Sequence, residues 1–308
     1  MRVATLDLGT NTFLCLICDV EDGIIQTVFE DQVRVVRLGQ DVNKTRKLHP
    51  EALKRAEECF KEFAQLISDH RPDRVMAFAT SAARDVQNAN ELFELGKRFA
   101  IPIQVISGEQ EAECTFAGTI DSELTKPVAI VDVGGGSTEF IIGDQEGIKF
   151  RTSLDIGSVR LTERFITEHP VKDIELKNLE QHLTNETSTL SSILDKLPIE
   201  LKPSKVIAVA GTPTTLATLD MGLPFEGDKV HGYKLSLSAI KVWADKLRLM
   251  TIEERQSLAG MEPKRADVIV AGALTLLHSC KVFECEEVEV SIRGLRYGIA
   301  KLMSQGAV

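Results

Sequence analysis

The sequence lacks the features that mark membrane-spanning, secreted and disulfide-stapled proteins. It has no uninterrupted apolar run approaching the roughly 18 residues of a membrane span. The first ten residues carry Asp7 inside their apolar stretch, so we expect no signal peptide. The six cysteines are scattered through 308 residues, which is no disulfide framework. These absences predict a cytoplasmic protein that has no membrane partner.

The chain also lacks an excess of positive charge. Its formal net charge is −10, whereas proteins that bind nucleic-acid backbones broadly are usually basic, so we expect no nucleic-acid partner. A small anionic ligand is still permitted, because a few arginines, backbone amides and a metal ion can form a local anion site. Since one compact core rarely exceeds about 250–300 residues, the length of 308 residues favours two domains.

Cys15 and Cys18 have the spacing of a redox or metal motif. Their surroundings, FLCLICDV, are typical of a β-strand, in which residues three apart point to opposite faces. No histidine lies near enough in sequence to complete a zinc site there. We therefore expect two ordinary strand residues.

Two series of strands and helices follow each other along the chain. The first series has a strand at 3–8, a hairpin broken at 21–23, a helix at 49–70, a strand at 74–80, a helix at 88–100, a strand at 103–107 and a helix beginning at 108. The second series has three strands within 127–157, helices beginning at 158 and spanning 175–197, a strand at 205–211, helices beginning at 212 and spanning 236–250 and 265–283, a strand at 287–291 and a helix from 294.

An internal repeat links the two series. Residues 4–13, ATLDLGTNTF, and 129–140, AIVDVGGGSTEF, share an apolar strand, an Asp-x-Gly turn, a hydroxyl and a second apolar strand. Asp7 and Asp132 are equivalent in this repeat. We predict a duplicated α/β fold with domains 1–124 and 125–308, the final helix at 295–308 packing back on the first domain, and a ligand in the cleft between them.

The repeated turn has the chemistry of a phosphate site. Glycine allows a tight bend and close approach to the backbone, and consecutive free N–H groups in such a bend bind anions. Asp7 and Asp132 can hold Mg²⁺, because hard cations take carboxylate oxygens. Amides that bind anions beside carboxylates that bind a metal predict phosphoryl chemistry. The predicted phosphate-binding residues are Gly9, Thr10, Asn11, Thr12, Gly134, Gly135, Gly136 and Ser137, with the hydroxyl of Thr138 as a further donor.

A third glycine and hydroxyl segment, AGTPTTLA at 210–217, stands between a strand and a helix. The N-terminus of a helix is itself an anion site, which makes Gly211, Thr212 and Thr214 further phosphate-binding candidates. An ordinary helix N-cap remains an equal alternative.

Five motifs together resemble those of the exopolyphosphatase and guanosine pentaphosphate phosphatase (Ppx/GppA) family, over essentially the whole chain and in the right order. They are DLGTNT at 7–12, ATSAARDVQN at 79–88, SGEQEA at 107–112, DVGGGSTE at 132–139 and AGTPTTLA at 210–217. The resemblance implies actin–Hsp70–sugar-kinase-like (ribonuclease H-like) domains with an interdomain active-site cleft. The chain has the length expected of the short form of the family, without a helical C-terminal region.

The resemblance also implies roles for particular residues. Glu111 would activate the attacking water, and Arg84 would contact the terminal phosphate, which suits the planar fork of arginine. Glu139 would bind Mg²⁺ or orient the water together with Asp132. Mg²⁺ is thus the expected cofactor, and K⁺ is a candidate activator because it can neutralise a polyanion.

One segment departs from the family pattern. In EVSIRGLRYG, Ile292 stands where many members carry an acid. We expect Arg293 and Arg296 nearby to be solvated at the surface, with contact to a polyanion as the alternative.

The implied activity is Mg²⁺-dependent release of the terminal phosphate of polyphosphate, or of the 5′ γ-phosphate of guanosine pentaphosphate. Polyphosphate is favoured because the sequence has one Trp and two Tyr for stacking on a base. Its basic candidates for a polyanion track are Arg34, Arg37, Lys44, Arg46, Lys47, Lys264 and Arg265. The alternatives are a non-catalytic sensor of guanosine tetra- or pentaphosphate and a small-molecule kinase of the same superfold. The sequence leaves the oligomeric state open, a homodimer included.

Overall fold

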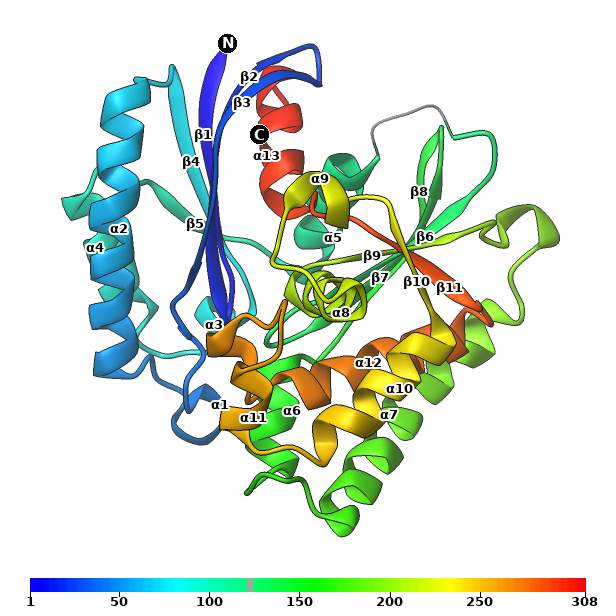
Figure 1. The fold of residues 1–308 in the computed structure, drawn as a ribbon. Coiled ribbons are helices and arrows are strands. Elements are labelled where there is room, and N and C mark those ends of the chain that lie inside the picture. Colours follow the sequence, from blue (N-terminus) through cyan, green and yellow to red (C-terminus); the bar gives the residue numbers. More distant parts are fainter. Residues whose placement is uncertain (121–123) are drawn as a thin grey trace. The chain divides into compact units, whose positions relative to one another are not determined.

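The computed structural model describes residues 1–120 and 124–308, which form two compact units (Figure 1). The first unit comprises Met1–Asp121 and Arg293–Val308, and the second comprises Ser122–Ile292. The boundary predicted after residue 124 adjoins the segment 121–123, which lies outside the described residues.

The first unit is built on a sheet of five strands in the order β3-β2-β1-β4-β5. β1 to β3 form an antiparallel meander, and β4 and β5 continue it in parallel with β1. The strands are β1 (Arg2–Leu8), β2 (Thr12–Glu21), β3 (Ile24–Val35), β4 (Arg74–Ala79) and β5 (Ile103–Val105). The helices are α1 (Val42–Thr45), α2 (Pro50–His70), α3 (Ser81–Arg84), α4 (Ala89–Arg98), α5 (Gly108–Thr119) and α13 (Leu295–Ser304).

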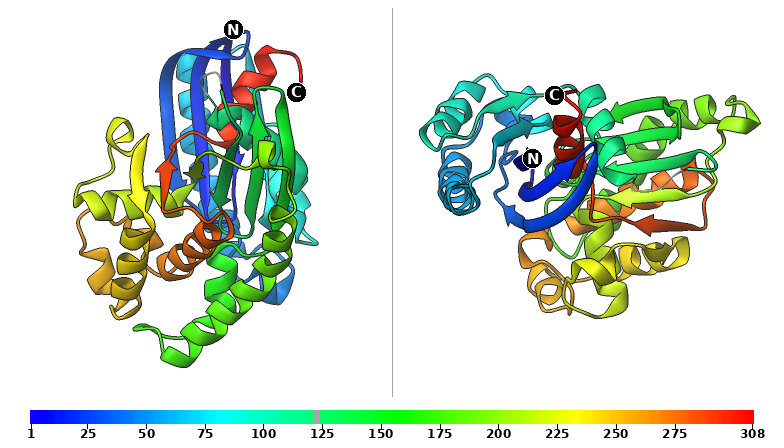
Figure 2. Two further views of the ribbon diagram at one scale, coloured as in Figure 1. Left: turned by 90° about the vertical axis from the view of Figure 1, so that its right-hand side faces the viewer. Right: turned by 90° about the horizontal axis from the view of Figure 1, so that it is seen from above.

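The sheet of the first unit has an apolar layer on each face. Alternation along β2 sends Cys15 and Ile17 into one buried cluster, with α2, and Leu16 and Cys18 into the other, with α13. The prediction that Cys15 and Cys18 are ordinary strand residues is therefore confirmed. Because α13 packs against α5, β1 and β2, the last helix of the chain completes this unit beside its first strands (Figure 2).

The second unit repeats the plan around a six-stranded sheet in the order β10-β11-β9-β6-β7-β8. Its strands are β6 (Val128–Val133), β7 (Thr138–Asp144), β8 (Gly147–Leu154), β9 (Val206–Val209), β10 (Tyr233–Ser236) and β11 (Glu287–Val290). Its helices are α6 (Ser158–Phe165), α7 (Asp173–Leu194), α8 (Gly211–Met221), α9 (Gly227–Val230), α10 (Leu237–Arg248), α11 (Ile252–Gln256) and α12 (Ile269–Val282), with 3₁₀ turns η1 (Ile199–Leu201) and η2 (Pro263–Arg265).

The two sheets confirm the predicted duplication of an α/β fold. In both, an antiparallel meander of three strands is extended by parallel strands from its first member, and in the second sheet β10 adds an antiparallel edge strand. α12 is buried along nearly its whole length, which explains its lack of a polar face. In the described parts of the chain, no helix combines the length and apolar character needed to cross a membrane. The sequence missed β10, because four residues at a sheet edge give too short a pattern to recognise.

Candidate active site

The two repeated loops close in the same way. Gly9 N donates to Thr12 O at 3.0 Å, and Gly134 N donates to Ser137 O at 3.1 Å. Each loop joins a pair of directly opposed residues, Leu8 with Phe13 and Val133 with Thr138. The loops 9–12 and 134–137 therefore have equal length, and Asp7 and Asp132 both lie two residues before the first glycine of their loop.

The carbonyls of the second loop are held by the start of α6. Gly134 O accepts from Ser158 N at 2.9 Å, Gly135 O from Val159 N at 2.9 Å, and Gly136 O from Arg160 Nε at 2.7 Å. In a planar trans peptide the C=O and the following N–H point in opposite directions. Three consecutive N–H groups, those of residues 135–137, are thus turned away from α6, as an anion-binding nest requires.

The first loop is fixed by the segment that follows β3. Asn11 O accepts from Val36 N at 3.0 Å and Arg37 N at 2.8 Å, and Thr10 O accepts from Gly39 N at 2.8 Å. The same peptide geometry turns the N–H groups of residues 11 and 12 away from that segment. Asn11 is 8% exposed, and its buried Oδ1 has no hydrogen-bond partner. A buried acceptor without a donor indicates a place for a ligand or a bound water.

The third loop leads from β9 into α8. Ala210 has φ 76° and ψ −168°, a conformation nearly reserved for glycine, which is typical of strain at functional sites. No side chain caps α8, so its first N–H groups stay open to an anion. The hydroxyl of Thr214 instead lies 3.1 Å from Ala210 O, to which it donates. A Cβ at Gly211 would lie 1.7 Å from Arg265 Nη1, so this cation is set against the start of the helix.

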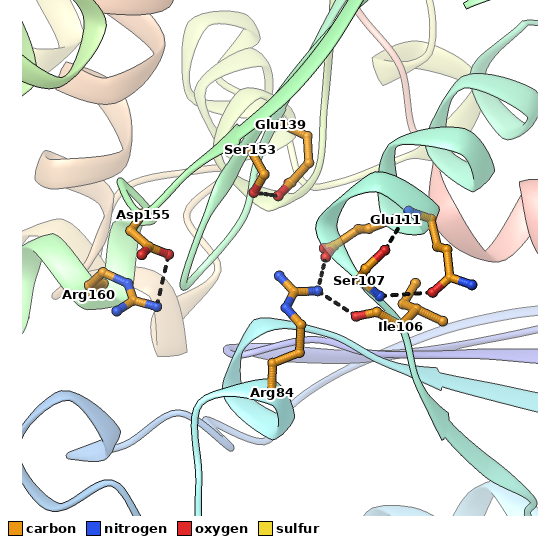
Figure 3. Close-up of polar contacts among 9 residues, drawn as sticks. Arg84, Ile106, Ser107, Glu111, Glu139, Ser153, Asp155 and Arg160 are labelled. Carbon is orange, nitrogen blue, oxygen red and sulfur yellow. Dashed lines mark hydrogen bonds and ion pairs between the residues drawn. The ribbon is translucent and has the colours of Figure 1, made fainter.

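Arg84 and Glu111 form an ion pair within the first unit (Figure 3). Arg84 ends α3, and its Nη1 donates to Glu111 Oε2 at 2.7 Å and to Ile106 O at 2.9 Å. Glu111 lies in the first turn of α5, which begins with a capping box formed by Ser107 and Gln110. Burial raises the pKa of Glu111, and the cation of Arg84 only partly opposes this shift.

Glu139 is buried in the second unit and is 1% exposed. It lies opposite Asp132 on the neighbouring strand, and its Oε1 accepts from Ser153 Oγ at 2.7 Å (Figure 3). Across the described ranges 1–120 and 124–308, no three His, Cys, Asp or Glu side chains gather to hold a metal. Two carboxylates nevertheless fit Mg²⁺, which is usually held by one or two carboxylates, water and substrate phosphates.

Arg160 of α6 holds the second loop, and sequence reasoning missed it. Besides its bond to Gly136 O, its guanidinium lies 3.4 Å from Asp155, and Figure 3 shows the two side chains facing each other. The clue would have been the helix start at Gly157 soon after the glycine loop, because helix N-termini often hold a loop carbonyl or anion.

The expectation that Arg296 is solvated is wrong. Arg296 is 6% exposed, and its Nε and Nη2 donate to Asp31 at 2.6 and 2.8 Å. Tyr297 OH also donates to Asp31, at 2.9 Å. These contacts tie α13 to β3, which lies more than two hundred residues earlier in the chain. Arg293 is half-buried, with its guanidinium 5.5 Å from the Tyr297 ring.

Two Asp-x-Gly repeats, each with an aspartate before a loop whose backbone N–H groups are turned outward, are an arrangement typical of phosphoryl-transfer proteins. The profile of the Ppx/GppA phosphatase family matches residues 16–304, and the chain belongs to this family of phosphoanhydride hydrolases.

Several known proteins are similar to this chain. Exopolyphosphatase 2 of Mycobacterium tuberculosis is 36% identical over 287 residues, covering 89% of this chain and 88% of the relative. A guanosine-5′-triphosphate,3′-diphosphate pyrophosphatase of Vibrio vulnificus is 28% identical over 98% of this chain and 59% of its own length. The crystal structure of the Aquifex aeolicus Ppx/GppA family member has a TM-score of 0.79 at 32% identity, covering 99% of this chain and 98% of that one.

Proposed function

We propose that this protein hydrolyses the terminal phosphoanhydride bond of inorganic polyphosphate and releases orthophosphate, with Glu111 as the general base and Mg²⁺ as the cofactor. Guanosine pentaphosphate, which presents the same kind of terminal bond, is the second candidate substrate because a relative is named for it.

The buried Glu111–Arg84 pair is the observation that carries the proposal. A general base works best when its pKa lies nearer to the working pH than that of an exposed glutamate. Burial raises the pKa of Glu111 in that direction, while Arg84 keeps an ionised form accessible. In the reaction, Glu111 would take a proton from water, the water oxygen would bond to the terminal phosphorus, and the bridging P–O bond would break toward the shortened chain.

Arg84 is suited to hold the terminal phosphate while it positions Glu111. Both of its contacts in the structure use Nη1. The N–H groups on Nε and Nη2 lie in the same plane and match two phosphate oxygens. The amides of loops 9–12 and 134–137 and of the start of α8 would bind further phosphate oxygens, and their fixed orientation favours the charge that develops in the transition state.

Asp132 and Glu139 are the residues that would hold Mg²⁺ in the second unit, and Asp7 is the equivalent carboxylate of the first unit. When bound, Mg²⁺ would neutralise charge on the phosphate oxygens. The unpartnered Oδ1 of Asn11 would accept a hydrogen bond from a water in the first loop.

The aromatic side chains favour polyphosphate over a nucleotide. Tyr297 is 4% exposed, so its ring cannot stack on a base. The other Tyr and the Trp are held by one carboxylate at the surface. Tyr233 OH and Trp243 Nε1 both donate to Asp220, at 2.7 and 3.1 Å. Among the basic candidates for a polyanion track, Arg34 is bound to Glu62 at 2.7 Å.

The test is orthophosphate release from long-chain polyphosphate and from guanosine pentaphosphate, measured side by side with Mg²⁺ and with EDTA. We expect Mg²⁺-dependent release that is faster from polyphosphate. Faster release from guanosine pentaphosphate would reverse the substrate assignment. Release from neither substrate by folded protein would contradict the proposed function.

A further inference from the structure

A row of polar residues crosses three strands of the second unit. Asp132 on β6 lies directly opposite Glu139 on β7, and Glu139 lies directly opposite Ser153 on β8. Directly opposed residues on neighbouring strands project to the same face of a sheet. The hydroxyl of Ser153 therefore continues the side of the sheet that carries the two carboxylates.

The first unit has apolar residues in the corresponding row. There Asp7 on β1 lies opposite Leu14 on β2, and Leu14 lies opposite Val33 on β3. By this register Leu14 corresponds to Glu139, and Val33 corresponds to Ser153. The third strand of the first unit thus carries valine, a β-branched residue of the kind that strands usually prefer, where the second unit has Ser153. Strand formation alone does not call for serine there.

The environment of Glu139 explains the serine. Glu139 is 1% exposed, and a buried carboxylate is unstable unless donors satisfy its oxygens. Ser153 Oγ donates to Glu139 Oε1 at 2.7 Å, a short bond typical of a hydroxyl bound to a charged acceptor (Figure 3). Ser153 is itself exposed, so this hydrogen bond joins an exposed hydroxyl to a buried carboxylate.

We propose that Ser153 is a positioning residue, which fixes the carboxylate of Glu139 through its hydroxyl so that the acid can bind the divalent cation. The inference rests on the proposed function, in which Glu139 is a metal-binding residue. Groups that orient a metal ligand typically change metal affinity or activity by about 10–100-fold when they are removed.

The test compares Ser153→Ala, Ser153→Val and Ser153→Thr with the wild-type protein. Thr152→Ala is the matched control, because it removes a hydroxyl from the next position of β8, where the side chain points to the opposite face. Mn²⁺ binding is measured from the free-ion signal in electron paramagnetic resonance. The kcat and KM for polyphosphate are measured in parallel, and thermal melting checks the fold.

We expect Ser153→Ala and Ser153→Val to weaken Mn²⁺ binding and to lower kcat by about 10–100-fold, with KM for polyphosphate little changed. Ser153→Thr, which keeps the hydroxyl, should restore most of both quantities, and Thr152→Ala should resemble the wild type. A purely structural role would lower the melting temperature without this separation of kcat from KM.

Wild-type Mn²⁺ affinity and kcat in Ser153→Ala would overturn the inference, as would failure of Ser153→Thr to restore either quantity. If the wild type released no orthophosphate, the proposed function would fail by itself. Mn²⁺ binding by the same variants would still decide the role of Ser153.

Discussion

At the residue scale, the Glu111–Arg84 pair combines two opposing influences on one carboxylate. Burial disfavours the charged form of Glu111, and the guanidinium 2.7 Å away favours it. Burial is the larger influence, so the pKa of Glu111 lies above that of an exposed glutamate. The pair therefore couples the placement of the proposed base to its proton affinity.

This coupling predicts the pH dependence of the reaction. The base must be ionised, so kcat/KM should fall as the pH drops through the raised pKa of Glu111. Arg84→Met removes the cation, which should raise that pKa further and move the acid limb to higher pH, besides raising KM. The pH profile of kcat/KM measures this shift. An acid limb that stays in place or moves to lower pH in Arg84→Met would argue against the assignment.

A second residue-scale prediction concerns stability. The side chains of Arg296 and Asp31 are 8% and 21% exposed, so Arg296→Met leaves a largely buried aspartate without its cation. We expect a loss of about 3 kcal/mol in the free energy of unfolding, measured by urea denaturation.

The control for this change is Lys205→Met. Lys205 pairs with Glu289 at 3.0 Å, but the two side chains are 45% and 35% exposed. Exposed pairs contribute about 0–1 kcal/mol, so this variant should be nearly as stable as the wild type. Equal losses of unfolding free energy in the two variants would mean that burial does not make the Arg296–Asp31 pair more important for stability than the exposed pair.

At the scale of elements, α13 completes the first unit through a close crossing with α5. A Cβ at Gly298 would lie 1.7 Å from Cys114 O, and a Cβ at Gly118 would lie 2.0 Å from Gly294 O. Glycine at the crossing lets the two backbones approach, and α5 carries Glu111. Helix packing and the position of the proposed base are therefore linked.

Gly298→Ala should push α5 and α13 apart. We expect a loss of about 1–3 kcal/mol in unfolding free energy, as for other overpacked cores, together with a lower kcat because Glu111 shifts. Gly294→Ala is the control, since a Cβ there meets nothing within 4 Å. Urea denaturation and phosphate release measure both effects, and a stable, fully active Gly298→Ala would refute the link.

Local patterns predicted most of these elements. The spacing of apolar residues at 49–70 gave α2 nearly to the residue, because one face of that helix is buried. The burial of Arg296 could not be predicted, because it depends on Asp31, 265 positions away. The same holds for Ser153, whose role is visible only once the register of β7 and β8 is known.

At the scale of the whole molecule, duplication has preserved the loops and changed the rows beside them. Both loops close with the same N–H to carbonyl bond, and both follow an aspartate. Asp132 has Glu139 opposite, whereas Asp7 has Leu14. The repeated Asp-x-Gly motif made the duplication predictable. The different residues opposite the two aspartates become visible only once the strand register is known.

The difference predicts unequal effects of two equivalent substitutions. Asp132→Asn should raise the Mg²⁺ concentration for half-maximal activity by at least about tenfold, the size seen even for groups that only orient a ligand. Asp7→Asn should lower activity with a smaller change in Mg²⁺ requirement, because no second carboxylate lies opposite it. Mg²⁺ titrations of phosphate release compare the two, and equal shifts would contradict the asymmetry.

The most direct test of the account is the turnover of Glu111→Gln on polyphosphate at saturating Mg²⁺. Glutamine keeps the size and the acceptor oxygen that faces Arg84 but cannot take the proton. We predict that kcat falls about 10²–10⁴-fold while KM and the melting temperature stay close to the wild-type values. Turnover near the wild-type rate would show that another group activates the water, and the central assignment would be wrong.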